Sequence, residues 1–384
     1  MNRIEELDGL RAFAIFAVFL IHFRPVNQPV FGFMALGWAG VDLFFVISGF
    51  LITGILWNLR KHSTPFREFY WRRGLRIFPP YYLALLLILL LAHLHREVIP
   101  HKEQIGAWFF LSSLLKGFSV RLMAKRLFLH AGFAMTPQFL DVHHFELFMR
   151  GPGIFWSLSA EELFYLIWAP IVLKGTKNFI VFCSVAPLIV CPILRGLTHT
   201  ADAMETFGFV TRFDSLSAGA CLALLFLAAR QGKVSIRTLE RCSLIAAPVS
   251  ALALFLLSCR CGLFRNVELR STLAFSIFGY TLIAIICAAF VGLCVRWSGS
   301  HRTRWLRIRP LIYLGAISYM MYLIHVSVYV AIGIGLNHFG DFPQELIWQG
   351  ILGIGFTIGL AALSWRYYGR QSFVLRTDSA LFPQ

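Results

Sequence analysis

Long apolar runs separated by short polar links dominate the pattern along this chain of 384 residues. A helix needs about 20 apolar residues to cross the hydrocarbon core of a bilayer, and most of the runs reach that length. Eleven apolar stretches cover residues 9–23, 38–59, 77–94, 105–118, 153–173, 178–194, 207–229, 240–258, 272–295, 311–336 and 346–365. The fourth is short for a span. The pattern therefore predicts an all-α polytopic integral membrane protein with about 10 (at most 11) transmembrane helices.

The distribution of charge predicts how these helices are oriented. Basic residues gather in three links, at 60–76, 230–241 and 296–309. Cytoplasmic loops are enriched in Lys and Arg, so we expect these links on the cytoplasmic side and the link 337–345, which has neither residue, outside. The assignments agree if 105–118 does not cross the bilayer. This hypothesis gives ten spans, cytoplasmic termini and an outer region at 95–152.

Composition supports the membrane assignment and indicates which kinds of partner to expect. Hydrophobic residues make up 58% and charged residues 14% of the chain, against about 25% charged in soluble domains. The net charge of +16 would suit nucleic acid, but basic links explain it better, so the lipid bilayer is the expected partner and nucleic acid is not. The eight cysteines lie mostly in apolar runs without a CxxC pair, which favours neither a disulfide framework nor a zinc site.

Two ionisable residues, Arg11 and His22, bracket the first apolar run. Their spacing of eleven residues places them on the same helix face, about 16 Å apart along the axis. Charged residues in a membrane are costly and usually face protein or a water-filled cavity. The alternative is that Arg11 extends to the membrane surface and His22 is a packed polar residue.

Acidic residues begin two of the predicted spans. Asp42 begins the second, and Glu161 and Glu162 lie early in 153–173. Both spans enter from the outer side, so we expect these carboxylates at the depth of His22, and several ionisable groups at one depth favour a functional site.

A structural alternative exists for the acidic pair. Ser157 or Ser159 can cap a helix start, and glutamates in a first turn favour the helix dipole. Adjacent side chains point about 100° apart on a helix, so we expect only one of Glu161 and Glu162 to face the interior.

Three further features are candidates for binding or support. Arg73 and Arg76 are spaced i, i+3, and guanidinium groups suit phosphate, although from charge alone a basic anchor at the membrane surface explains them better. Arg212 and Asp214 have poor helical geometry for pairing. His325 is a second intramembrane histidine, with packing as the alternative role.

Together these residues resemble the motifs of the acyltransferase family 3 membrane proteins, in order over residues 1–370. Arg11, ten intervening residues and His22 are similar to the family's Arg-X10-His signature. The other matching motifs lie at residues 40–50, 73–76, 156–165 and 318–325, the last including Tyr319. One departure is at Gly369 and Gln371, where the family often has Glu-Arg-Pro.

The resemblance implies an O-acyltransferase of the bacterial inner membrane, multi-pass, with cytoplasmic acyl-CoA, commonly acetyl-CoA, as donor. The acceptor would be a glycan or glycolipid hydroxyl at the outer side. His22 would act as base or be acylated itself, and a carboxylate would orient it. The residues implied are His22, Asp42, Glu161 and Glu162 for catalysis, Arg11, Arg73 and Arg76 for the donor, and Ser157, Arg212, Asp214, Tyr319 and His325 in support.

The tract 141–146, Asp-Val-His-His-Phe-Glu, could bind a metal, but its spacing is not a recognised ligand set, so no metal is expected. We expect a membrane domain over 1–370 and a short cytoplasmic tail over 371–384, without the C-terminal hydrolase-like domain of some relatives. The competing interpretation is a polytopic transporter or flippase, but transporters often show inverted repeats and the sequence shows none.

Overall fold

The computed structural model describes residues 4–23, 32–94, 155–198, 210–262, 272–337 and 345–369. These ranges form helices joined by turns and contain no strand. The long helices are α1 (Glu5–His22), α2 (Gly40–Leu59), α3 (Pro65–Leu94), α7 (Trp156–Lys174), α8 (Lys177–Leu197), α10 (Phe213–Arg230), α11 (Ile236–Cys261), α12 (Tyr280–Arg296), α13 (Arg309–Asn337) and α14 (Glu345–Ser364). Short 3-10 or π segments are η1 (Gly32–Ala39), η3 (Val210–Arg212), η5 (Phe275–Gly279), η6 (His301–Arg307) and η7 (Trp365–Gly369).

The prediction of an all-α polytopic membrane protein is confirmed. Eight helices among the described residues are long and apolar enough to cross a membrane. α1 and α7 have similar lengths but carry acidic residues that lower their hydropathy. The stretch 105–118 lies outside the described residues, so the total of ten or eleven spans stays a prediction.

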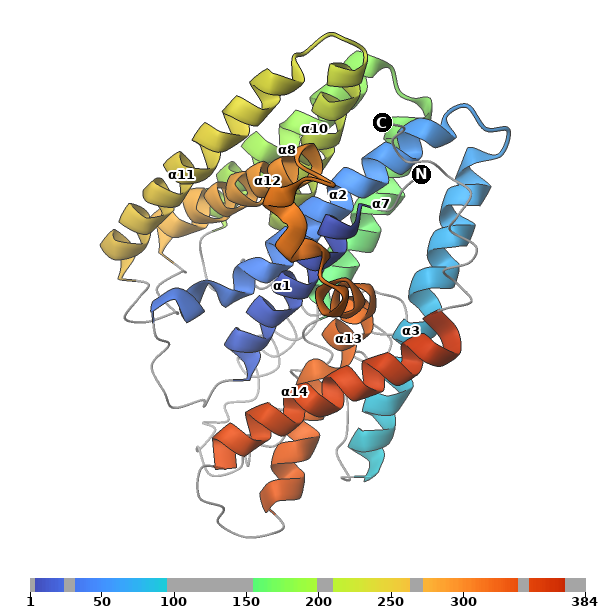
Figure 1. Cartoon of the computed structure of the whole chain (residues 1–384), viewed down its shortest axis with the longest axis vertical. Coiled ribbons are helices and arrows are strands. Elements are labelled where there is room, and N and C mark those ends of the chain that lie inside the picture. Colours follow the sequence, from blue (N-terminus) through green and yellow to red (C-terminus); the bar gives the residue numbers. More distant parts are fainter. Residues whose placement is uncertain are drawn as a thin grey trace, which may run out of the picture.

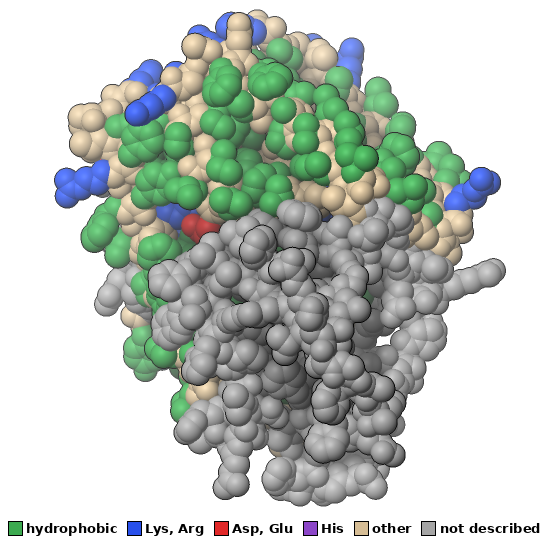
Figure 2. All heavy atoms as spheres, turned by 180° about the vertical axis from the view of Figure 1, so that it is seen from behind, with side chains coloured by type: hydrophobic (Ala, Val, Ile, Leu, Met, Phe, Trp, Pro, Cys, Tyr) green, Lys and Arg blue, Asp and Glu red, His purple; other side chains and the backbone are tan. Residues whose placement is uncertain are grey.

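The helices form a bundle with a buried centre and an apolar periphery (Figure 1). α2 and α10 are the most buried spans, whereas α8, α11 and α14 expose most of their surface. Figure 2 shows one face of the molecule, where apolar side chains cover much of the described surface and Lys and Arg lie toward its edges. Such exposed apolar faces are what lipid contact requires.

Contacts between helices fix their relative directions. α1 is parallel to α13, since Asp8 lies against Gly315 and His22 against His325. α2 is parallel to α10, since Asp42 contacts Arg212 near the start of each. Further contacts bring the links at 230–241 and 296–309 together at one end of the bundle. Two of the three basic links thus share an end, in agreement with the charge pattern.

One boundary differs from the sequence-based expectation. We expected a link over 60–76, but α3 already begins at Pro65. Proline suits the first position of a helix, because its fixed φ is helical and its missing N–H would lack a partner there anyway. Arg73 and Arg76 therefore lie two to three turns inside a helix instead of in a loop.

Two glycines allow the close crossing of α2 and α10. A Cβ at Gly49 would overlap the backbone carbonyl of Leu216, and a Cβ at Gly219 would overlap that of Val46. Glycine at these two positions therefore lets the two backbones approach more closely than a residue with a side chain would.

Gly219→Ala is expected to destabilise the protein by about 1–3 kcal/mol, because packed backbones must separate to admit the methyl group. The thermal midpoint of purified protein in detergent measures this. Gly355→Ala is the matched control, since a Cβ there meets nothing within 4 Å. Equal midpoints for the two variants would contradict this account of the crossing.

Candidate active site

Two histidines meet where the end of α1 lies against the middle of α13. Nε2 of His325 lies 3.4 Å from Nδ1 of His22, and the ring centroids are 5.0 Å apart at an interplanar angle of 74°. His325 is fully buried, whereas His22 is exposed. The rings of Phe19 and Phe23 pack beside His325. The structure thus joins the two intramembrane histidines into one pair, which spacing along the sequence did not predict.

Backbone carbonyls hold both imidazoles. Nδ1 of His22 lies 2.9 Å from the carbonyl oxygen of Val18, and Nδ1 of His325 lies 2.7 Å from that of Tyr322. A carbonyl oxygen only accepts hydrogen bonds, so each Nδ1 is the protonated nitrogen. In the neutral forms Nε2 then carries the lone pair, and in His22 this is the atom that a base or nucleophile would use.

A hydroxyl pair extends the site from α13 to α7. The hydroxyls of Ser157 and Tyr322 lie 2.6 Å apart. The helix starts after Phe155 without a side-chain capping bond, and the Ser159 hydroxyl donates to the Phe155 carbonyl within α7. The capping alternative for these serines is therefore wrong, and Ser157 belongs to the polar group around the histidines.

A second cluster joins α3, α2 and α7. Nη2 of Arg73 lies 3.1 Å from Glu161 and 3.4 Å from Glu162. Ser48 donates a hydrogen bond of 2.6 Å to Glu161, the Tyr165 hydroxyl also donates to Glu161, and the Arg73 guanidinium lies over the Tyr165 ring. The expectation that only one glutamate faces the interior is wrong, because a long guanidinium side chain reaches both.

The two arginines of the 73–76 motif are placed differently. The Arg73 side chain is 12% exposed and held by the glutamates, whereas Arg76 is exposed and acts electrostatically on Glu162. Tyr319 donates to the Ile77 carbonyl at 3.3 Å, beside the same cluster. Of the two arginines, Arg76 is thus the one whose side chain is exposed.

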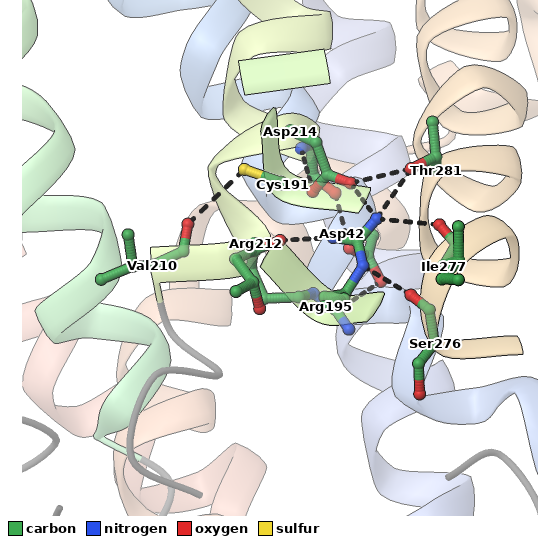
Figure 3. A network of polar contacts seen from close by, with 11 residues as sticks. Asp42, Cys191, Arg195, Val210, Arg212, Asp214, Ser276, Ile277 and Thr281 are labelled. Carbon is green, nitrogen blue, oxygen red and sulfur yellow. Dashed lines mark hydrogen bonds and ion pairs between the residues drawn. The ribbon is translucent and has the colours of Figure 1, made fainter. Parts of the chain in front are cut away.

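Asp42 lies in a third, separate network (Figure 3). Its carboxylate forms an ion pair with Arg212 and accepts a 2.7 Å hydrogen bond from Ser215. The residue is fully buried. The structure therefore joins Asp42 to Arg212 and not to His22.

The depth expected for Asp42 was also wrong. α2 continues η1, and Gly40 packs against Ala14 and Ala17 of α1, five to eight residues before His22. At 1.5 Å per residue this sets Gly40 about 7–12 Å from the histidine level along the axis, and Asp42 follows two residues deeper in α2. The expected depth was wrong because η1 precedes α2 and occupies the outer part of this segment, so that Asp42 lies deeper than the start of the apolar run suggests. A part for Asp42 in catalysis stays a prediction.

Asp214 pairs with an arginine that the sequence analysis missed. Arg195, at the end of α8, lies 2.8 Å from Asp214 and is 2% exposed. It also donates to the carbonyls of Ser276 and Ile277 and to the Thr281 hydroxyl (Figure 3). Arg212 and Asp214 thus each pair with a partner from another helix and not with each other. The sequence feature that could have pointed to Arg195 is that it is a lone arginine at the end of an apolar run.

Polar contacts also fix the opposite end of α1. Arg11 pairs with Asp8 at 3.1 Å, in the signature segment 7–11. Glu6 is 1% exposed and accepts hydrogen bonds from Ser298, the Gly299 amide and Thr303. Arg11 therefore lies about two turns after the start of α1, and His22 is its last residue.

Among the cysteines, Cys191 lies beside the third network, where its thiol donates to the Val210 carbonyl (Figure 3). Within the described ranges, no group of three His, Cys, Asp or Glu residues is arranged to hold a metal ion. The eight cysteines have free thiols. The tract 141–146 lies outside the described residues.

Fold and site together define a polytopic helical membrane protein with a histidine pair and buried ion pairs inside its bundle. The chain belongs to the acyltransferase domain family, whose sequence model matches residues 4–366. The resemblance to acyltransferase family 3 is therefore confirmed.

The curated relatives carry related names. The peptidoglycan O-acetyltransferase OatA of Listeria monocytogenes is 27% identical over 389 residues, covering 95% of this chain and 55% of that protein. The putative peptidoglycan O-acetyltransferase YrhL of Bacillus subtilis is 27% identical over 95% of this chain and 54% of its own. The O-acetyltransferase OatA of Staphylococcus aureus is 26% identical over 95% and 56%. The chain thus spans about half the length of these relatives. No solved structure matches.

Proposed function

We propose that this protein is a membrane-embedded O-acyltransferase of the bacterial inner membrane. It moves an acyl group, acetyl by analogy with the relatives' names, from cytoplasmic acyl-CoA to a hydroxyl of a glycan or glycolipid at the outer side. The observation that carries the proposal is the pair of His22 and His325 in a chain of the acyltransferase domain family.

His22 performs the chemistry by one of two routes. As general base, its Nε2 takes the proton of the acceptor hydroxyl while that oxygen attacks the thioester carbonyl and the coenzyme A thiolate leaves. As nucleophile, Nε2 attacks the carbonyl, the thiolate leaves, and the acceptor oxygen then displaces the imidazole from the acyl group. In both routes a proton ends on the thiolate and an ester forms. The exposure of His22 suits either route.

The donor side uses the arginines. Arg76 binds the phosphates of coenzyme A, since it is the exposed member of the 73–76 motif. Arg73, held by Glu161 and Glu162, ties α3 to α7 and so fixes the position of Arg76. Arg11 lies eleven residues before His22 in α1 and guides the donor toward the bundle.

The remaining predicted residues support this machinery. Asp42 and Arg212 join α2 to the start of α10, and Asp214 joins that start to α8. Ser157 and Tyr319 fix α13 against α7 and α3. These contacts hold the helices that carry the histidines and Arg76 in register.

Purified protein in lipid vesicles, given acetyl-CoA with a labelled acetyl group and a glycan acceptor, tests the proposal. We expect labelled ester on the glycan and free coenzyme A. Arg76→Ala should raise the KM for acetyl-CoA more than it lowers kcat, because it removes binding made equally in ground and transition states. Gradient-driven uptake of a solute without any transfer would overturn the proposal in favour of the transporter.

A further inference from the structure

The second histidine is the least expected part of the site. His325 is fully buried among Phe19, Phe23 and neighbouring apolar side chains. A polar ring in such surroundings is costly unless it is hydrogen-bonded. Both nitrogens of His325 have partners, Nδ1 the carbonyl of Tyr322 and Nε2 the ring of His22. The ring is therefore held from two sides.

The hydrogen bonds determine which nitrogens carry protons. Nδ1 of His325 donates to the Tyr322 carbonyl, and complete burial disfavours the charged ring. Its Nε2 therefore presents a lone pair toward Nδ1 of His22, 3.4 Å away. Nδ1 of His22 bears a hydrogen, because it donates to the Val18 carbonyl at 2.9 Å. That N–H is thus shared between the carbonyl and Nε2 of His325.

We propose that His325 is a positioning residue for His22, which it orients by accepting the Nδ1–H hydrogen bond. This contact fixes the ring plane of His22 and keeps its Nε2 unprotonated. In a serine protease triad a carboxylate orients the histidine in this way. Here the acceptor is a neutral imidazole, so it supplies orientation without a counter-charge.

The proton count stays balanced through the reaction. When Nε2 of His22 takes the acceptor's proton, the resulting imidazolium keeps its Nδ1–H bonds to Val18 and His325. The proton on Nε2 later leaves with the thiolate. His325 neither gains nor loses a proton. The catalytic consequence rests on the proposed acyl transfer, but the geometry of the pair does not.

Three substitutions separate positioning from packing. His325→Gln retains an acceptor oxygen near the place of Nε2, His325→Phe retains the ring volume without nitrogen, and His325→Asn retains a donor for the Tyr322 carbonyl only. We expect the Phe and Asn variants to lose about 10²-fold in kcat, the cost of misplacing a catalytic group, at unchanged KM for acetyl-CoA. The Gln variant should recover most of the rate. In a His22→Ala background, His325→Phe should cost nothing more, because it acts through His22.

A second measurement is independent of acyl transfer. Diethyl pyrocarbonate modifies unprotonated imidazole nitrogen, and mass spectrometry reports the rate at exposed His22. We expect this rate to fall in the Phe variant and to be retained in the Gln variant. If the Phe variant does not fold, the Asn variant supplies the same comparison.

The outcomes distinguish the two proposals. Equal turnover of the Phe and Gln variants, or equal modification of His22 in both, overturns the positioning role and leaves the proposed function standing. If wild-type protein transfers no acetyl group while modification of His22 still depends on residue 325, the proposed function fails and the positioning role stands.

Discussion

Replacing His22 by alanine is expected to lower acyl transfer by about 10²–10⁴-fold, the usual contribution of a general acid or base. The residue is exposed at the end of α1, so its removal leaves no cavity and the protein should still insert and fold. Transfer of label from acetyl-CoA to the acceptor, with purified protein at matched concentration, measures the loss.

Leu20→Ala is the matched control, because Leu20 lies on the same helix and is 42% exposed. It should keep full activity. His22→Gln adds a second comparison, since an amide neither takes a proton nor accepts an acyl group under these conditions. Full acylation by both the Ala and Gln variants would show that His22 has no chemical role.

Arg195→Met is expected to destabilise the protein by about 3–5 kcal/mol, the usual cost of breaking a buried ion pair from one side. Asp214 is fully buried, and its pair with Arg195 measures 2.8 Å, so the variant leaves a buried carboxylate without its counter-charge. The carbonyls of Ser276 and Ile277 lose a donor as well. Thermal unfolding in detergent measures the effect as a large fall in midpoint.

Two comparisons make that result specific. Arg302→Met removes an arginine whose side chain is 65% exposed and whose pair with Glu240 is 3.7 Å long, and exposed pairs contribute about 0–1 kcal/mol. The double variant Arg195→Met with Asp214→Leu removes both charges and should recover part of the loss. An Arg195→Met protein as stable as the Arg302→Met control would contradict the structural role of this network.

The apolar pattern predicts most of the helices well, because burial in lipid requires long hydrophobic runs. It fails at α3, where Arg67, Arg72, Arg73 and Arg76 suggested a link although the helix begins at Pro65. A helix that meets acidic side chains of a neighbour can carry arginines within it, and only the packing of α3 on α7 reveals this. Hydropathy along one chain has no information about that neighbour.

Contacts between residues on different helices were harder to predict from the sequence than the helices themselves. His22 and His325 are 303 residues apart, and Asp42 and Arg212 are 170 residues apart. The spacing of residues within one helix therefore cannot predict either pair. Arg195 was missed because it closes an apolar run, where a basic residue usually marks the membrane surface. Its carboxylate partner Asp214 was named as a candidate, but the only arginine considered beside it was Arg212, which pairs with Asp42.

The polar contacts of Glu6 have a consequence for biosynthesis. This nearly inaccessible carboxylate at the start of α1 is satisfied by residues 292 to 297 positions later. Translation proceeds at about 5–20 residues per second. The segment that supplies these hydrogen-bond donors is therefore synthesised roughly 15–60 s after the first helix. During that interval, and in any chain whose synthesis stops before residue 298, the Glu6 carboxylate lacks these three hydrogen-bond donors.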